Sequence, residues 1–462
     1  MNNGLRHEPE HDDEFSPQPL LPSVPVSDAD ALGEGEASAA SGGDAHAADG
    51  RSGARPIKVC LYSHDTFGLG HLRRNLAIAE RLLSHEGRFS VWLLTGSPVI
   101  RQWRLPAGLH VQPLPPVVKT GAERYASRKA GETFGMVKGY REALILKLVL
   151  RQRPDILLVD HAPAGMHGEL LATLALMRRE LPKSRTVLGL RDILDSPPVV
   201  RQLWQEQDIH GLIEQAYDHV LVYGSRQVFN VVEAYGLPPN LARKVNYCGY
   251  VVSRGCTSSV TAPGAGEVCW STPRAGSRPV VLVTAGGGGD GHFLMDAYLK
   301  ALQTVPMNQC YSVIVTGPLM PREQRDALQA AVALRTDVEF VDYTTNLVPS
   351  VQSAELIVAM AGYNTSAEII AARKKAILVP RAAPREEQRL RARLLAARGL
   401  AWYAEPGPAL AQALAALLPT VLAAPSPTPF DISGLDLNGA EKAASLLLAL
   451  CDHNMERLEG AA

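Results

Sequence analysis

Residues 57–83 read IKVCLYSHDTFGLGHLRRNLAIAERLL, and this stretch decides the fold class of the chain. It begins with a short, mostly apolar run at 57–63 that is typical of a buried strand. A turn with Gly68 and Gly70 follows, where glycine lets the backbone bend sharply and approach a ligand. From 72 to 83, apolar residues recur at helical spacing. A strand, a glycine-rich turn and a helix in this order predict a parallel sheet with crossover helices.

The same alternation continues along the chain and predicts two similar α/β domains. The first sheet is expected to use strands near 57–63, 90–95, 156–160, 186–190 and 219–223. After an irregular stretch, further strands are expected near 279–284, 311–316, 338–341, 356–360 and 376–379. We therefore predict two Rossmann-like domains, at 56–255 and 279–425, that face a central cleft. The linker is expected at 256–278, and 426–462 should hold a C-terminal helix that can return to the first domain.

The charge of the chain is unevenly distributed. The 462 residues are 46% apolar and 20% charged, with a net charge of −1. This composition excludes a collagen-like chain, a disulfide scaffold and a wholly disordered protein. Residues 1–55 hold 11 acidic and three basic residues without apolar periodicity, so we expect a disordered acidic tail of charge −8. The rest of the chain then carries +7, which is compatible with an anionic ligand.

The cysteines and the hydropathy indicate a cellular location. The six cysteines are scattered and form no C-x-x-C pair, which is typical of buried, reduced thiols and argues against a metal site. No run of about 18 apolar residues is present, and the acidic beginning is unlike a secretory signal peptide. We therefore expect a cytoplasmic protein.

His71 is the first candidate catalytic residue, because it stands where the first helix begins. A helix N-terminus disfavours imidazolium, so a neutral His71 can accept a proton from a substrate hydroxyl. The alternative is a histidine that only caps the helix. Asp160 and His161 follow another strand, in VDHAPAGMHGEL, and either line an acceptor cleft together with Glu169 or form an ordinary strand-end turn.

The second candidate element is the run of four glycines at 286–289, in VLVTAGGGGDGHFLM. Backbone N–H groups exposed before a helix form an anion cradle that suits a diphosphate. The alternative is a flexible connection, although four glycines carry a large entropic cost for that. The run is neither a Walker A loop nor a dinucleotide fingerprint, because the residues that complete those motifs are missing.

A third element spans 356–398. Gly362 ends a strand, and Thr365 and Ser366 are predicted to cap the next helix, with Glu368 in its first turn. The Glu368 carboxylate either interacts with the helix dipole or accepts two hydrogen bonds from a ribose diol. Residues 373–398 contain nine Arg or Lys and two Glu, which form either a solvated helix face or a surface that steers an anionic donor.

These three elements, in this order, resemble the GT-B nucleotide-sugar glycosyltransferases of the family-28 type, which include the transferase that forms lipid II. The resemblance rests on TFGLGH at 66–71, the glycine loop, and AGYNTSAE at 361–368. It implies that Glu368 binds the ribose, that Phe340 and Val341 lie near the uracil, and that Gln388 contacts the donor sugar. The donor side implied in this way comprises Gly286, Gly287, Gly288, Gly289, Asp290, Phe340, Val341, Gly362, Asn364, Thr365, Glu368, Arg385, Glu387 and Gln388.

The chain also resembles a bacterial group of predicted glycosyltransferases, through SHDTFGLGHLRRNLAIA, Arg191-Asp192 in GLRDILDSP, and PREEQ at 384–388. The acceptor side would then hold Gly68, Gly70, Asp160, His161, Arg191 and Asp192. The resemblance implies inverting transfer from a UDP-linked sugar to a saccharide or lipid-linked acceptor, with His71 as the base. It implies no cofactor, no metal and no nucleic-acid partner. The glycine loop departs from the lipid II transferase, so the donor sugar and pathway stay open.

Three alternatives to transfer remain. GLGH and Val-Asp-His also resemble the nucleotide-sugar hydrolase of pseudaminic acid synthesis, in which water replaces the acceptor. A non-hydrolysing epimerase shares the expected fold, and a regulatory protein would bind the nucleotide-sugar without turnover. Separately, 119–153 carries nine Lys or Arg and three Glu around ALILKLVL. This segment is either a peripheral patch for the inner membrane face or an ordinary amphipathic crossover helix.

Overall fold

The structure is a computed structural model in which residues 55–64, 70–103, 105–121, 124–127, 131–252, 276, 278–304, 306, 309–342, 344, 347–381, 385–425 and 435–459 are described. The acidic segment up to residue 54, Gly68 and most of the predicted linker lie outside the described residues. The predictions made for them stay predictions.

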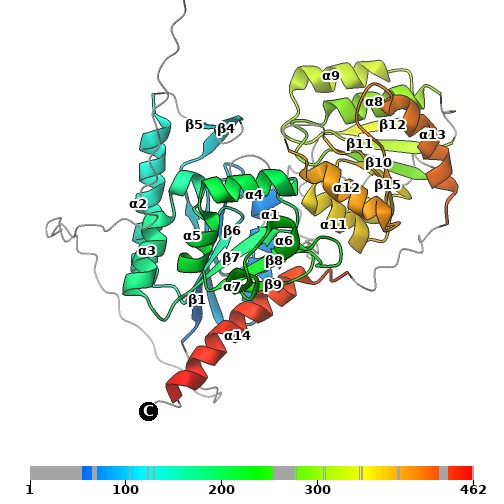
Figure 1. Cartoon of the computed structure of the whole chain (residues 1–462). Helices are drawn as coiled ribbons and strands as arrows, with labels where there is room; N and C mark the ends of the chain where they lie inside the picture. The colour runs from blue at the N-terminus through cyan, green and yellow to red at the C-terminus, as the bar shows by residue number, and fades with distance from the viewer. Residues whose placement is uncertain are drawn as a thin grey trace, which may run out of the picture. The chain divides into compact units, whose positions relative to one another are not determined.

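Seven parallel strands form the first sheet, in the order β3-β2-β1-β6-β7-β8-β9 (Figure 1). The strands are β1 (Ile57–Ser63), β2 (Phe89–Thr95), β3 (Leu109–Pro113), β6 (Ile156–Asp160), β7 (Arg185–Arg191), β8 (His219–Tyr223) and β9 (Val245–Tyr247). Its helices are α1 (Gly70–Leu83), α2 (Phe134–Gln152), α3 (Leu171–Glu180), α4 (Pro197–Glu206), α5 (Ile209–Ala216), α6 (Val231–Tyr235) and α7 (Pro239–Ala242). A separate antiparallel hairpin joins β4 (Val117–Gly121) to β5 (Arg124–Ser127).

Six parallel strands form the second sheet, in the order β12-β11-β10-β13-β14-β15. The strands are β10 (Val280–Thr284), β11 (Tyr311–Val315), β12 (Val338–Val341), β13 (Leu356–Ala359), β14 (Lys375–Leu378) and β15 (Trp402–Tyr403). Its helices are α8 (His292–Leu302), α9 (Arg322–Ala331), α10 (Val348–Ser353), α11 (Tyr363–Ala371), α12 (Glu387–Ala397) and α13 (Leu410–Ala423). Helices cover both faces of this sheet (Figure 1).

The predicted α/β class with two parallel sheets is confirmed. Every predicted strand is present, with its ends within one residue of the prediction. Central strands such as β6 and β10 are buried along their whole length, because parallel sheets are covered on both faces, and they therefore read as apolar runs. The edge strands β3, β9 and β15 are only half-buried, so they lack such a run and the sequence did not predict them.

The last helix, α14 (Gly439–Glu459), packs against α1, on the first sheet. Its buried residues Ala440, Ala443, Ala444 and Leu447 lie in one apolar cluster with Leu72 and Leu76 of α1. Within the described residues, no helix is long and apolar enough to cross a bilayer.

The chain leaves the first sheet and returns to it at one place. Val251 forms an isolated antiparallel bridge with Asn438, and the Tyr250 amide donates to the Asp436 carbonyl at 2.7 Å. Gly249 has a φ of +85°, and a Cβ at this position would lie 2.4 Å from the Asp436 carbonyl oxygen. Glycine is therefore required where the outgoing and returning segments lie side by side.

Candidate active site

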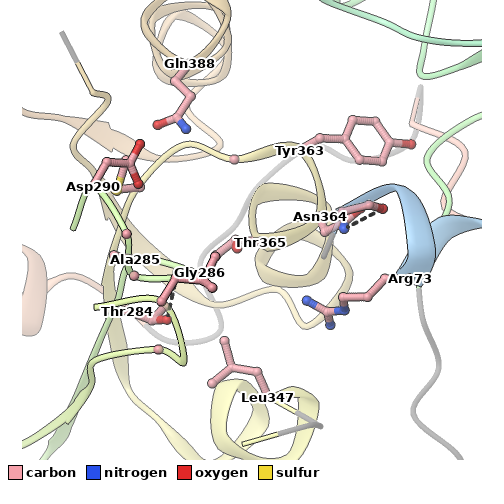
Figure 2. Close-up of a pocket in the computed structure, with 18 of the residues that line it drawn as sticks. Arg73, Thr284, Ala285, Gly286, Asp290, Leu347, Tyr363, Asn364, Thr365 and Gln388 are labelled. Carbon is pink, nitrogen blue, oxygen red and sulfur yellow. Dashed lines mark hydrogen bonds between the residues drawn. The ribbon is translucent and has the colours of Figure 1, made fainter. Parts of the chain in front are cut away.

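One pocket is lined by the N-terminal turns of helices that flank the first sheet and of helices that flank the second sheet (Figure 2). In parallel α/β sheets, ligands bind at the carboxyl ends of the strands, where helix N-termini converge and present positive partial charge. Residues of the first sheet's domain that line the pocket are Gly70, His71, Arg73, Arg74, Trp103 and Arg191. Those of the second include Thr284, Gly286, Gly287, Gly288, Gly289, Asp290, Leu347, Gly362, Tyr363, Asn364, Thr365, Arg381, Glu387 and Gln388.

The four glycines join β10 to α8 along one wall of this pocket. Gly288 has a φ of +85°, and a Cβ there would lie 2.0 Å from the carbonyl oxygen of Thr316. Among the described residues, the loop's own hydrogen bonds use the amides of Gly286, Gly288 and Gly291 and leave those of Gly287 and Gly289 unused. With the first turn of α8, these amides can bind an anion.

Helix α11 begins earlier than the sequence predicts. Gly362 precedes its first residue, Tyr363, so Thr365 and Ser366 lie inside the helix. The prediction that they cap it was therefore wrong, and so was the placement of Glu368 in the first turn. Tyr363 is buried, and its hydroxyl accepts a 3.0 Å hydrogen bond from the Val251 amide. Asn364 reaches the other domain too, donating to the Gly70 carbonyl at 3.2 Å.

Glu368 lies behind the pocket wall and is 3% exposed. Its Oε1 accepts a hydrogen bond from Nη2 of Arg73, on α1. Its Oε2 is buried and has no hydrogen-bond partner among the described residues. Burial raises the pKa of Glu368, although the Arg73 charge opposes this.

Arg381 forms hydrogen bonds with three of the residues expected on the donor side. Its guanidinium lies 3.1 Å from Asp290 Oδ2 and 2.5 Å from Glu387 Oε1, and its amide donates to Gln388 Oε1 at 3.2 Å. Burial alone would raise the pKa of Glu387, but Arg381 and the other nearby arginines lower it. Arg381 was not among the site residues predicted from the sequence. Its place directly after the strand β14 and the proline that follows was the available signal.

The partly exposed His71 is paired with the buried Asp160. Nδ1 of His71 lies 2.6 Å from Oδ2 of Asp160. The other oxygen of the same carboxylate, Oδ1, accepts a hydrogen bond from Nη2 of Arg74 at 2.6 Å. A lone pair on Nδ1 would face the carboxylate, so we assign the proton to Nδ1, which leaves Nε2 as the acceptor. Burial alone would raise the pKa of Asp160, but Arg74 and His71 lower it to about 2. Burial also lowers the pKa of His71, although Asp160 opposes this.

Two more histidines surround this pair. The ring centroids of His71 and His161 are 5.1 Å apart, and His64 lies 5.8 Å from each. Burial, followed by the charge of Arg191, holds the pKa of His161 well below its usual value. Asp160 and His161 thus stand beside His71 without lining the pocket, whereas Arg191 lines it. Burial lowers the pKa of Arg191 to about 10.

The structure does not bring every predicted site residue to the pocket. Asp192 is fully buried and lies 3.3 Å from Arg391 of α12. Val341 is buried in the core of the second sheet, and Phe340 packs half-buried against that core. Arg385 does not line the pocket. Leu347, which follows the strand β12, lines it instead.

Glu169 is a structural residue, which corrects its expected place in an acceptor cleft. Its side chain is fully buried and forms a bidentate ion pair with Arg141, at 2.6 and 2.7 Å. The Tyr62 hydroxyl donates to the same carboxylate at 2.5 Å. Both carboxylate oxygens are occupied within the core, so Glu169 does not contact a substrate.

Comparisons with known proteins agree with this geometry. Residues 280–426 match the model of the glycosyltransferase family 28 C-terminal domain. An uncharacterized glycosyltransferase of Methanosarcina mazei is 24% identical over 323 residues, which cover 66% of this chain and 75% of the relative. The UDP-N-acetylglucosamine--N-acetylmuramyl-(pentapeptide) pyrophosphoryl-undecaprenol N-acetylglucosamine transferase of Rhizobium meliloti is 27% identical over 181 residues, or 39% of this chain and 48% of that protein.

The solved structure of the glycotransferase of kitacinnamycin has the same fold, with a TM-score of 0.59 and 16% identity over 86% of this chain and all of that one. The architecture is therefore that of the GT-B class. With the family-28 match in its second domain, the chain is a family-28-like glycosyltransferase.

Proposed function

We propose that the chain transfers a sugar from a UDP-linked donor to a hydroxyl of a saccharide or lipid-linked acceptor, with inversion at the anomeric carbon. One observation supports this above all. The glycine loop before α8 and His71, which is paired with Asp160, line the same pocket from opposite domains. An anion cradle and a proton acceptor on opposite sides of a pocket suit displacement of a diphosphate by a hydroxyl.

The donor would bind along the second domain. Its diphosphate would accept hydrogen bonds from the amides of Gly287 and Gly289, which are preorganised for the negative charge of the leaving group. Its ribose diol would donate to the two carboxylate oxygens of Glu368. Its base would contact Leu347, and its sugar would lie near Glu387 and Gln388.

The acceptor would approach from the first domain. Nε2 of His71 would take the proton of the acceptor hydroxyl as that oxygen attacks the anomeric carbon. The bond from this carbon to the diphosphate oxygen breaks, and the nucleoside diphosphate leaves with the electron pair. Attack from the face opposite the diphosphate inverts the configuration. Asp160 keeps the proton on Nδ1 and stabilises the imidazolium that forms.

A panel of nucleoside diphosphates tests the donor. We expect UDP to raise the thermal unfolding midpoint more than GDP, CDP or dTDP do, since a ligand at about 100 times its Kd stabilises the folded state by about 2.7 kcal/mol. Glu368→Ala should abolish most of this shift, and Glu323→Ala, on the exposed α9, should not. A panel without any UDP preference would contradict the donor assignment. Rapid release of free sugar from UDP-sugars without an acceptor would favour the hydrolase.

A lipid-linked acceptor would bring the protein to the inner membrane face. On α2, the side chains of Met136 and Tyr140 are 64% and 68% exposed. Arg141, counted among the basic residues of this segment, is buried with Glu169 and does not contribute to a surface patch. We expect co-sedimentation with anionic liposomes at low salt, and reduced binding of a Met136→Ser/Tyr140→Ser variant. Absence of binding at low salt would remove the membrane proposal.

A further inference from the structure

Arg73 occupies the carboxylate that the donor's ribose is proposed to use. It lies in the first turn of α1, and its guanidinium points into the pocket beside Asn364 and Leu347 (Figure 2). There it donates to Oε1 of Glu368, 295 residues further along the chain. Because Arg73 occupies Oε1 of this carboxylate, a nucleoside that binds both oxygens of Glu368 must displace Arg73.

The ion pair leaves Glu368 incompletely satisfied. Only Oε1 has a hydrogen-bond partner, while the buried Oε2 has none among the described residues. A buried carboxylate oxygen without a donor is unfavourable. A ribose offers two hydroxyl donors at the spacing of the two carboxylate oxygens, so it would satisfy the oxygen that Arg73 leaves unpaired.

Arg73 would not remain unpaired after its displacement. Its side chain is 17% exposed and lines the same pocket as Gly286 and Gly287. A diphosphate in the glycine loop would therefore place anionic oxygens in the pocket that the guanidinium already enters. Hydrogen bonds from a guanidinium to a carboxylate and to a phosphate are both charge-assisted, so this exchange replaces one strong ion pair with another.

We propose that Arg73 is an exchangeable partner: it binds Glu368 in the empty site and the donor diphosphate when the ribose has taken Glu368. This inference rests on the proposed function. Arg73 is two residues from His71 in the same helical turn, so the turn that carries the proposed base changes its contacts when the donor binds.

Calorimetry with uridine and UDP tests the exchange, using the full chain and Arg73→Met. Uridine has a ribose but no phosphates, so in the unaltered chain it competes with Arg73 for Glu368 and gains no contact with the guanidinium. We therefore expect uridine to bind Arg73→Met at least about threefold more tightly than the unaltered chain. UDP also loses its guanidinium contact, so the ratio of UDP to uridine affinity should fall at least about tenfold. In a Glu368→Gln background, Arg73→Met should no longer improve uridine binding.

Arg81→Met is the matched control, because Arg81 lies on the same helix and its ion-pair partner among the described residues is the half-exposed Glu441, at 3.8 Å. It should change neither affinity. Unchanged uridine affinity with weakened UDP binding in Arg73→Met would make Arg73 a plain phosphate contact and overturn the exchange. Equal weakening of both ligands would make its role structural and overturn it too. If the unaltered chain bound neither ligand, the proposed uridine donor would fail, and the inference with it.

Discussion

Replacing His71 with alanine is expected to lower turnover of the UDP-sugar by at least about 100-fold, the usual contribution of a general base. The affinity for UDP should stay within about threefold of that of the unaltered chain, because His71 itself makes none of the proposed donor contacts. The fold should persist, since Asp160 keeps its ion pair with the buried Arg74. The measurement is the rate of UDP release with donor and acceptor, alongside calorimetry with UDP.

The pH dependence of the original protein is part of the same expectation. Only neutral His71 accepts a proton, and burial lowers the pKa of its imidazole below the usual 6.5. The value of kcat/KM should therefore be constant around pH 7 and fall as the pH drops below 6.5. A decline that began well above pH 7 would contradict this assignment.

His110→Ala is the control for the substitution, since His110 is exposed and stacks on Trp92 with ring centroids 4.7 Å apart. It should keep full turnover. If His71→Ala turned over the UDP-sugar nearly as fast as His110→Ala, His71 would not be the base.

Gly288→Ala is expected to have the second large effect, on both stability and donor binding. Its φ of +85° disfavours any side chain by about 1–2 kcal/mol. Its Cβ would also overlap the Thr316 carbonyl oxygen, and relief of such crowding typically costs about 1–3 kcal/mol. We expect the thermal unfolding midpoint to fall by about 5–10 °C and the affinity for UDP to fall at least about tenfold, because the loop must move.

Gly287→Ala is the control, because it also replaces a glycine of this loop by alanine but does not create the steric overlap expected for Gly288→Ala. Its Cβ would lie 3.3 Å from Cδ1 of Leu319, a flexible side chain, and its φ is not positive. Its unfolding midpoint should change by less than about 2 °C. Equal midpoints and equal UDP affinities for the two variants would show that the backbone of Gly288 is not the constraint described above.

The fold was predictable because its central strands are buried on both faces. In β1, β6 and β10 this burial appears in the sequence as an apolar run, and a glycine-rich turn marks where β1 and β10 pass to the next helix. The pocket accordingly contains many of the glycines named from the sequence, together with Asn364 and Gln388. Their roles as ligands remain predictions.

Other parts of the site depend on contacts between side chains that lie far apart in the sequence, and a single sequence does not reveal which residues form such contacts. Arg391 forms an ion pair with Asp192, 199 residues away in the sequence. From the sequence alone, Arg391 belonged to a run of basic residues that was interpreted either as a solvated helix face or as a surface that steers an anionic donor. Arg73 likewise has its partner on the second domain. Phe340 was expected at the base because its segment resembles the one that frames the uracil. Its side chain packs, half-buried, against the core instead, and the pocket is lined by residues after that strand.

The double crossing of the chain at 249–251 and 436–439 has a mechanical consequence. The segment that leaves the first sheet and the segment that returns to it are joined here by backbone hydrogen bonds, including one from the Gly439 amide to the Tyr250 carbonyl at 2.9 Å. A displacement of one of these two segments is therefore transmitted directly to the other. The Tyr363 hydroxyl accepts a hydrogen bond from the Val251 amide at the same place, so the first residue of α11 is tied to the two joined segments. Through this contact a displacement of the joined segments reaches the N-terminal turn of the helix that carries Glu368.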